Sequence, residues 1–319
     1  MTDSYRSRLG PVVTGNDAVD NPGLVLDRYQ RRTRGDAKAM ETFLNRVCAS
    51  PPSRIYQDAY NDWRETILAL SGVRAREFKA TSRLIVGLGN ESVRETGISL
   101  LKPYGVPYLP GSALKGLAQR YADAHLDTAQ RAYLAYLFGA HESAAYLTYF
   151  DAWYIPGSAQ ADHPLCRDVI TVHHPRYYNA REPDRRAPWD LDDPTPVPFL
   201  SATGRYLVTV RGPDQDRRWA EEALKVITRA LADWGIGGKT SSGYGRMTAV
   251  IDTGGLMAAI AALGSQEAAR GALSQLFGQV TALPADQQET AAKALYAKLQ
   301  AFGLHTLPLG GVLRKRANL

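Results

Sequence analysis

Apolar residues recur every three to four positions in several stretches of the chain, the spacing that puts them on one face of an α-helix. The clearest stretch covers residues 217–234, where Trp219, Ile227 and Trp234 share a face. Similar spacing predicts helices over 36–49, 54–71 and 127–138, a helix from Ser112 through Tyr121, and a helical appendage over 254–303. Helices are therefore expected at both ends of the chain.

Strands interrupt this helical pattern between residues 78 and 251. Leu84, Val86 and Leu88 alternate with other residues and predict a strand over 78–88. Further strands are predicted over 145–152, 205–211 and 246–251. Taken in order, the main elements give β-α-β-β-α-β, the ferredoxin-like or RNA-recognition topology. We therefore predict an α+β protein with a ferredoxin-like core and N- and C-terminal helical extensions.

The predicted elements divide the chain of 319 residues into three regions. We expect residues 1–79 to form a partly helical N-terminal extension and residues 253–319 to form a C-terminal helical extension. The core then spans 80–252 and carries a long, proline-rich and charged insertion at about 154–198. A chain of this length can bury a full hydrophobic core and can hold one elaborated domain or two.

Residues Gly235–Arg246, the glycine loop, form the most informative segment of the chain. The loop holds five glycines, two cations and three serine or threonine side chains. Glycine tolerates positive φ, so successive N–H groups can point into one concavity and cradle an anion. A helix C-cap at Gly235 followed by a tight turn would explain one or two glycines, but not five beside two cations.

The glycine loop is therefore predicted to bind phosphate. We expect Gly238 to need both positive φ and close approach of the backbone. The expected RNA contacts in the loop are Gly237, Gly238, Lys239, Thr240, Ser241, Ser242 and Arg246.

The sequence Gly238-Lys239-Thr240 matches the end of a nucleotide-binding P-loop, but the rest of that motif is missing. A P-loop needs a glycine five positions before Gly238, where Asp233 stands, and it leads from a strand into a helix. Here the predicted helix precedes the loop and the predicted strand follows it. This order excludes the usual ATPase geometry and favours a polymeric phosphate backbone as the ligand.

A second candidate phosphate site lies in the segment Leu109–Gly116. Its Pro-Gly pair stops an extended segment, and Ser112 can cap the helix that follows. The N-terminus of a helix presents free backbone N–H groups to an anion. We therefore predict RNA contacts by Ser112, Lys115 and Gly116.

Histidine, arginine and tyrosine side chains gather at residues 173–178. Neighbouring residues of an extended chain face opposite ways, so His173 and His174 cannot easily act together on one phosphate as general base and acid. We predict RNA contacts by His174, Arg176 and Tyr177, with the arginine on phosphate and the tyrosine stacked on a base. A core or interface role would explain the tyrosines equally well.

No catalytic residue, metal site or cofactor is predicted. Asp151 and Asp168 are interpreted as strand-end or turn carboxylates, because no compact acidic cluster with metal-ligand spacing accompanies them. Two cysteines, Cys48 and Cys166, are too few for a disulfide framework or a cysteine-based zinc site.

The charge balance favours an anionic partner. The chain has 38 Lys and Arg against 32 Asp and Glu, which gives a formal charge of +6. No apolar run approaches the roughly 20 residues needed to span a bilayer. We therefore expect a soluble, cytoplasmic protein.

Four segments of the sequence resemble those of one known family. Leu109–Gly116 and the glycine loop are similar to the two signature segments of the RAMP superfamily, the RNA-binding subunits of CRISPR effector complexes. Asp168–Tyr178 and Pro196–Leu200 resemble the sixth-subunit family of the type III-B Cmr complex in particular. The similarity covers roughly residues 80–252.

This resemblance implies a subunit that holds the 3′ part of the guide RNA, or crRNA, and its paired target RNA in antiviral defence. Its protein partners would be the other Cmr subunits, above all the adjacent RAMP backbone subunits. In such complexes cleavage is assigned mainly to the neighbouring backbone subunit, through an aspartate in the loop after its first strand. The corresponding loop here offers Asn90, Glu91 and Glu95 but no aspartate, so we expect a non-catalytic subunit.

Two other functions stay open at this point. The chain could be a metal-independent endoribonuclease of the same superfamily that processes the CRISPR transcript with His173 or His174. It could also be a scaffold without RNA contact, which predicts no salt-sensitive RNA binding. Incubation of the purified protein with repeat RNA in EDTA tests the first of these alternatives.

Overall fold

The computed structural model describes most of the chain and assigns it to two compact units, Met1–Ala249 and Val250–Leu319. The described residues are 21–28, 37–90, 96–131, 133–139, 143–173, 177, 187, 194–213, 218–250, 253–281, 283 and 285–317. None of the helices in these ranges is long and apolar enough to cross a membrane. The two units are described separately below.

The first unit is built on a seven-stranded sheet, counted within the described residues, with the order β2-β3-β5-β8-β1-β9 and β4 paired to β8. Its strands are β1 (Val73–Ala80), β2 (Leu100–Leu101), β3 (Val106–Leu109), β4 (Thr148–Tyr149), β5 (Ala152–Tyr154), β8 (Arg205–Arg211) and β9 (Met247–Val250). The central pair is β1 and β8, which run antiparallel in a register that pairs Phe78 with Tyr206. The hairpin β2–β3 extends the sheet beyond β5.

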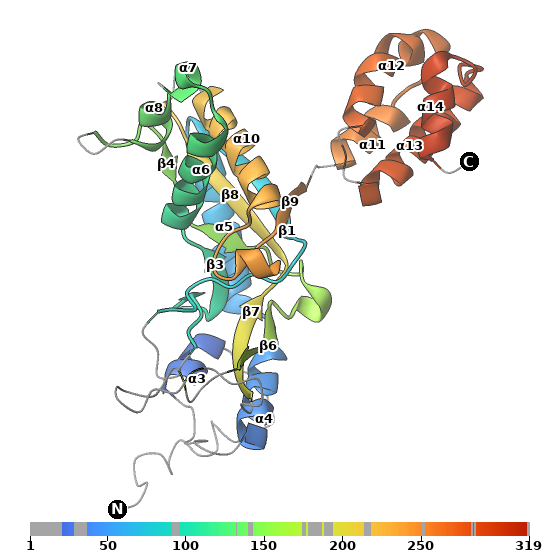
Figure 1. Cartoon of the computed structure of the whole chain (residues 1–319). Coiled ribbons are helices and arrows are strands. Elements are labelled where there is room, and N and C mark those ends of the chain that lie inside the picture. The colour runs from blue at the N-terminus through green and yellow to red at the C-terminus, as the bar shows by residue number, and fades with distance from the viewer. Residues whose placement is uncertain are drawn as a thin grey trace, which may run out of the picture. The chain divides into compact units, whose positions relative to one another are not determined.

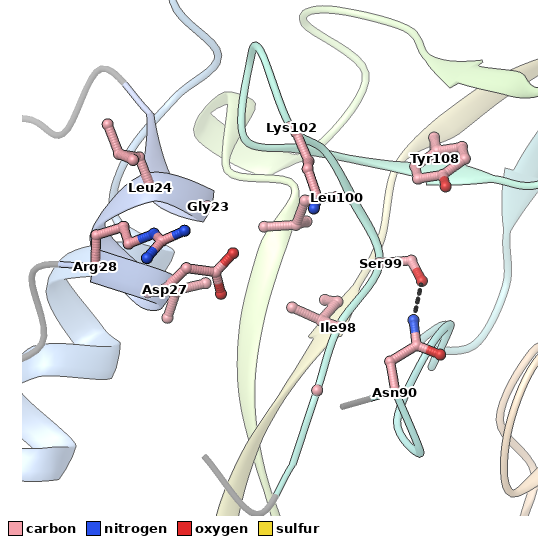
Figure 2. Close-up of a pocket in the computed structure, with 12 residues that line it drawn as sticks. Gly23, Leu24, Asp27, Arg28, Asn90, Ile98, Ser99, Leu100, Lys102 and Tyr108 are labelled. Atoms are coloured by element: carbon pink, nitrogen blue, oxygen red, sulfur yellow. Dashed lines mark hydrogen bonds between the residues drawn. The ribbon is translucent and has the colours of Figure 1, made fainter. Parts of the chain in front are cut away.

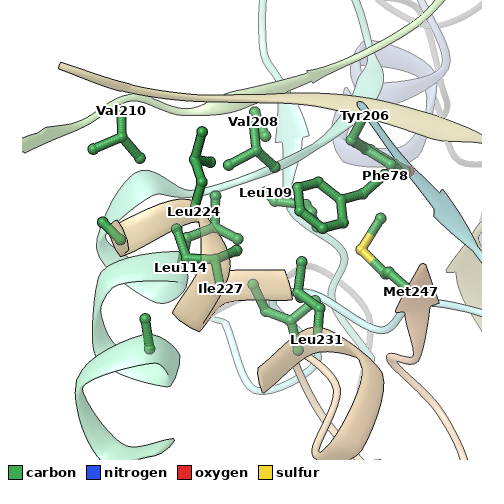
Figure 3. Packing of buried hydrophobic residues seen from close by; sticks show 14 of the residues in the cluster. Phe78, Leu109, Leu114, Tyr206, Val208, Val210, Leu224, Ile227, Leu231 and Met247 are labelled. Carbon is green, nitrogen blue, oxygen red and sulfur yellow. The ribbon is translucent and has the colours of Figure 1, made fainter. Parts of the chain in front are cut away.

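Helices α6 (Gly111–His125) and α10 (Arg218–Asp233) pack against each other on one face of this sheet (Figure 1). The buried residues of α10 recur at helical spacing and include Leu224, Ile227 and Leu231. They meet Val208 and Val210 of β8, as Figure 3 shows. The hydrophobic core of the first unit therefore lies between these two helices and the sheet.

The other face of the sheet is covered by α5 (Arg54–Ala69). Ser53 caps this helix by accepting a hydrogen bond from the N–H of Tyr56. Trp63 of α5 stacks on Trp153 of β5 with ring centroids 4.8 Å apart and an interplanar angle of 2°. The Tyr56 hydroxyl donates to the backbone oxygen of Tyr154 at 2.5 Å. Both faces of β8 are therefore buried, whereas Ala75 and Lys79 of β1 are exposed.

A second, two-stranded sheet lies beside the main one. Strands β6 (Leu165–Val172) and β7 (Thr195–Ala202) pair antiparallel along their full length. Helices α3 (Pro22–Arg28) and α4 (Ala37–Cys48) pack near this hairpin, where Leu26 and Leu44 join Leu165 and Leu200 in a small hydrophobic cluster. The predicted insertion at 154–198 therefore contains β6 and the first part of β7, together with the short 3-10 helix η1 (Gln160–Asp162).

The second unit is helical. Its elements are α11 (Thr253–Ala261), α12 (Gln266–Thr281), α13 (Ala285–Ala301) and α14 (Pro308–Arg316). They enclose their own hydrophobic cluster, with Leu273, Leu295 and Leu299 at most 5% exposed. The predicted helical appendage is present, and it extends to Arg316 rather than to residue 303.

Several predicted elements have different bounds in the structure. The strand expected over 78–88 begins at Val73 and ends at Ala80; Leu84 and Ile85 form only isolated bridges, to Ala202 and Gly237. The helix expected over 127–138 is two short helices, α7 (Thr128–Arg131) and α8 (Leu134–Phe138). The strand expected over 145–152 is split into β4 and β5.

The predicted order of elements is also modified. The hairpin β2–β3 was not predicted, and it stands between β1 and α6, so that α6 begins where β3 ends. A turn at Gly105, which has a φ of 69°, joins the two strands of the hairpin. The strands are too short for an alternating pattern to be recognised in the sequence. The order β9-β1-β8-β5 is otherwise that of an antiparallel α+β sheet.

Candidate nucleic-acid interface

The glycine loop is held in place by the chain segment Arg83–Ile85, which follows β1. The N–H of Gly238 donates to the backbone oxygen of Ile85 at 2.7 Å, and the N–H of Gly245 donates to that of Arg83 at 2.9 Å. The N–H of Arg246 donates to the Ser82 hydroxyl at 2.9 Å. Much of the loop backbone is therefore bound to the protein itself.

Gly237 is the glycine of this loop that makes close backbone approach possible. Its φ is 90°, and a Cβ atom added there would lie 2.1 Å from the backbone oxygen of Ile85. Gly238 does not have positive φ, and a Cβ atom there would meet nothing nearer than 3.6 Å. The expectation that Gly238 needs positive φ is therefore wrong. It is Gly237, the residue bridged to Ile85, that has positive φ.

Residues 239–242 form the tip of the loop and are exposed, apart from the half-buried Thr240. Lys239 is exposed and has a left-handed backbone with a φ of 56°, and it precedes the 3-10 helix η2 (Thr240–Ser242). Within the described residues, no hydrogen-bond acceptor is recorded for the backbone N–H groups of Lys239, Thr240 and Ser241. A left-handed residue followed by helical ones turns successive N–H groups toward one point, an arrangement that binds anions.

The two cations of the loop have different surroundings. Lys239 is exposed, whereas Arg246 is half-buried. The Nη1 atom of Arg246 is buried and has no hydrogen-bond partner within the part of the chain that the structure describes. Since an unpaired buried donor is costly, this guanidinium is suited to a phosphate oxygen.

Asp168 of β6 connects the loop to the second sheet. Its Oδ2 atom accepts from Nη1 of Arg83 at 3.1 Å, and Arg83 also donates to the backbone oxygen of Arg167. Burial, and then a hydrogen bond with Asp168, raise the pKa of Tyr244. Asp168 therefore holds the side chain of Arg83, whose backbone oxygen accepts from Gly245 of the glycine loop, a contact that the sequence did not reveal.

No group of three or more histidine, cysteine, aspartate or glutamate residues capable of holding a metal ion occurs among the described residues. Burial also raises the pKa of the Cys48 thiol to about 12, so its thiolate is not available at neutral pH. Asp151 accepts a hydrogen bond at the start of α6.

The N-terminus of α6 is occupied by that aspartate. Oδ1 of Asp151 accepts a hydrogen bond from the N–H of Gly111 at 2.8 Å. The helix cap residue is Pro110, and Ser112 is exposed inside the first turn without a side-chain capping bond. The prediction that Ser112 caps α6 is therefore wrong, because a carboxylate 40 residues away fulfils this role.

Lys115 and Gly116 lie one turn further along α6 and are half-buried. A Cβ atom added at Gly116 would find nothing within 4 Å. By contrast, one added at Gly111 would lie 2.3 Å from the backbone oxygen of Tyr149. Packing within the described residues therefore explains the glycine at 111 but not the glycine at 116.

The remaining predicted contacts lie at the end of β6. His173 is exposed and Tyr177 is half-buried, whereas His174 and Arg176 lie outside the described residues. The hydrogen bonds described above link the glycine loop with the segment Arg83–Ile85, and the side chain of Arg83 donates to Asp168. The RNA contacts expected along α6 and after β6 stay predictions.

A pocket of about 470 Å³ lies between α3 and the chain around β2 (Figure 2). Arg28, Asp27 and Lys102 stand at its rim, and the Asn90 amide donates to the Ser99 hydroxyl at 3.1 Å inside it. No sequence pattern indicated this pocket, because its walls come from segments more than 60 residues apart. It mixes both charge signs and defines no single ligand chemistry.

Comparison with known proteins identifies relatives of this chain. A model of the RAMP superfamily matches residues 77–248. The CRISPR system Cmr subunit Cmr6 of Pyrococcus furiosus is 32% identical over 251 residues, which cover 60% of this chain and 72% of that subunit.

Solved structures are similar as well. A chain of the type III-B Cmr-beta complex bound to cognate target RNA matches with a TM-score of 0.54 and 18% identity, covering 77% of this chain and 86% of that one. The crystal structure of Cmr6 from Pyrococcus furiosus matches with a TM-score of 0.38 and 29% identity, covering 56% of this chain and 98% of that one. The first of these likenesses establishes a shared fold.

Proposed function

This chain belongs to the RAMP superfamily and is a homologue of Cmr6 subunits, and from this premise we propose that it is a non-catalytic, guide-RNA-binding subunit of a type III-B CRISPR effector complex. The observation that carries the proposal is the tip of the glycine loop. There, three N–H groups and the Nη1 atom of Arg246 have no hydrogen-bond partner among the described residues, and together with the Lys239 ammonium they offer donors for the phosphates of one RNA backbone.

Membership of the superfamily also implies a ferredoxin-like core, which the strand order β9-β1-β8-β5 and the helices α6 and α10 support. We propose that residues 80–252 form this RNA-binding core and that residues 253–319 form a helical extension to it. Ser112, Lys115 and Gly116 would add contacts along α6, and His174, Arg176 and Tyr177 would add contacts after β6.

Within the complex, we propose that the subunit holds the 3′ part of the guide and its paired target RNA beside the adjacent RAMP subunits. The identity to Cmr6 of Pyrococcus furiosus supports this place in the assembly. Contacts to phosphates would fix the register of the RNA without selecting its sequence, which suits a subunit that must accept any guide.

The absence of a catalytic role is part of the proposal. Metal-free RNA cleavage needs a base and an acid poised at one phosphate, and the described residue His173 is exposed at a strand end. We expect His173→Ala to leave the rate of target cleavage by a reconstituted complex unchanged under single-turnover conditions. Cleavage of repeat RNA in EDTA by the isolated chain, lost in this variant, would instead support the endoribonuclease hypothesis.

The RNA contact is tested by salt dependence. We expect the double variant Lys239→Ala with Arg246→Ala to bind single-stranded RNA more weakly. The negative slope of log K against log salt should become shallower, by about 0.7 for each phosphate that the protein no longer binds. A matched control is Lys225→Ala with Lys293→Ala, which removes the same charge from exposed residues paired to Glu222 and Glu289. Equal slopes for the two double variants would exclude the glycine loop from the RNA site.

A further inference from the structure

Three rings meet where α6 and α10 end, directly before the glycine loop. Tyr121 and His125 of α6 stack with centroids 4.1 Å apart and an interplanar angle of 20°. The ring of Trp234 meets Tyr121 edge-on at 5.2 Å and lies 5.7 Å from His125. These three residues, the ring cluster, were not among the predicted RNA contacts.

The ring cluster is held by hydrogen bonds of its own. The Tyr121 hydroxyl donates to the carboxylate of Asp233, and Nδ1 of His125 is bonded to the backbone oxygen of Tyr121 at 2.8 Å. The backbone N–H of Trp234 donates to the backbone oxygen of Ala230 at 2.9 Å. Tyr121 is buried under the other two rings, whereas His125 is exposed and Trp234 is 37% exposed. The cluster thus offers pre-positioned aromatic surface to a ligand.

Charge and position both suit RNA. Arg229 is exposed four residues before Asp233 on α10, and Arg120 is exposed on α6 beside Tyr121. Trp234 directly precedes the glycine loop, and Lys239 follows it by five positions, a stretch that spans at most about 18 Å even when fully extended. Cations that follow the backbone and aromatic rings that stack on bases are the two components of single-strand binding surfaces.

We propose that His125 and Trp234 form a stacking platform for a base of single-stranded RNA whose phosphates are bound by the tip of the glycine loop. The proposal rests on the proposed function and adds the base contact to it. Stacking is tolerant of sequence because every base presents a π-face. Tyr121 is a positioning residue, because its ring stacks on that of His125 and its hydroxyl donates a hydrogen bond to Asp233.

The chain supplies a matched control at the other end of α10. Trp219 is half-buried and also lies among aromatic rings, with Tyr133 at 5.6 Å and Tyr136 at 6.3 Å. It is the second residue of the same helix, which is about 24 Å long for its 16 residues, and it does not adjoin the glycine loop. Substitution of each tryptophan therefore compares similar losses of aromatic area at two places.

The test measures binding of the full chain to an RNA oligomer and to an abasic oligomer of equal length. We expect the wild type to bind the RNA more tightly, and Trp234→Ala to lose about 5- to 150-fold in affinity for RNA but little for the abasic oligomer. Trp219→Ala should behave as the wild type does. The salt slope should be the same in all three proteins, because each of them keeps every phosphate-binding group.

Equal affinity of the wild type for the two oligomers would overturn the platform, and this comparison needs no variant to fold. An equal loss for both oligomers in Trp234→Ala would overturn it as well. Salt-sensitive binding that persists without preference for bases would leave the glycine-loop function standing. Absence of salt-sensitive binding to either oligomer would overturn the proposed function itself.

Discussion

The glycine loop and the start of α6 carry similar sequence signals but use their glycines differently. Both segments were expected to present free N–H groups to phosphate. In the glycine loop, contacts with Arg83–Ile85 fix the ends, and N–H groups at the tip have no acceptor within the part of the chain that the structure describes. At α6 the carboxylate of Asp151 already occupies the first N–H group. An anion site therefore depends on what the rest of the fold brings to the backbone, and glycine content alone does not reveal it.

The largest expected effect comes from Gly237→Val, which attacks the support of the glycine loop. The new Cβ atom would lie 2.1 Å from a backbone oxygen, and valine resists positive φ. We expect the free energy of unfolding to fall by about 2–5 kcal/mol, measured by urea denaturation. Gly238→Ala is the control and should change stability little, because its nearest neighbour is 3.6 Å away. Equal stability of the two variants would show that the close approach of Gly237 to the backbone oxygen of Ile85 does not stabilise the protein.

A smaller effect is expected from Asp151→Ala at the start of α6. Loss of this cap should lower the free energy of unfolding by about 1 kcal/mol, the usual cost of removing a capping side chain. RNA affinity should stay unchanged if the carboxylate only stabilises the helix. A rise in RNA affinity would mean that the N–H group of Gly111, once released by Asp151, binds phosphate. The start of α6 would then be a weaker anion site than the glycine loop and not an occupied one.

The smallest expected change in stability is a gain, from Gly116→Ala. Alanine favours the helix by up to about 1 kcal/mol over glycine, and the structure leaves open space for the methyl group. We expect a higher melting temperature together with weaker RNA binding, because the methyl group would hold a backbone ligand away from α6. Unchanged RNA affinity in this more stable variant would remove Gly116 from the RNA surface.

Much of the fold follows from local patterns in the sequence. The strand predicted over 205–211 coincides with β8, and the helix predicted over 217–234 differs from α10 by one residue at each end. These elements are long and buried, so their apolar spacing is clear. Short strands such as β2 and β4 contain too few residues to show any period.

The parts of the candidate site that lie within one segment could be predicted from the sequence. The contacts between residues that are distant in the chain could not. The glycine loop was recognised from its own residues, although the positive φ belongs to Gly237 and not to Gly238. Asp151 and Asp168 were seen as isolated carboxylates, because their partners Gly111 and Arg83 lie 40 and 85 residues away in the chain. Long-range pairing of this kind leaves no trace in spacing or composition.

The stack of Trp63 on Trp153 has a consequence for how bases can be discriminated. In RNA-recognition domains the bases lie on aromatic side chains of an open sheet, where edges as well as faces can be contacted. Here α5 covers part of that face, and the sheet tryptophan is already stacked on a ring of the same chain. Under the proposed function, RNA is bound at loops and helix ends, whose donors address groups common to every nucleotide. On that proposal the surface does not select the sequence of the RNA, so one protein would serve guides of any sequence.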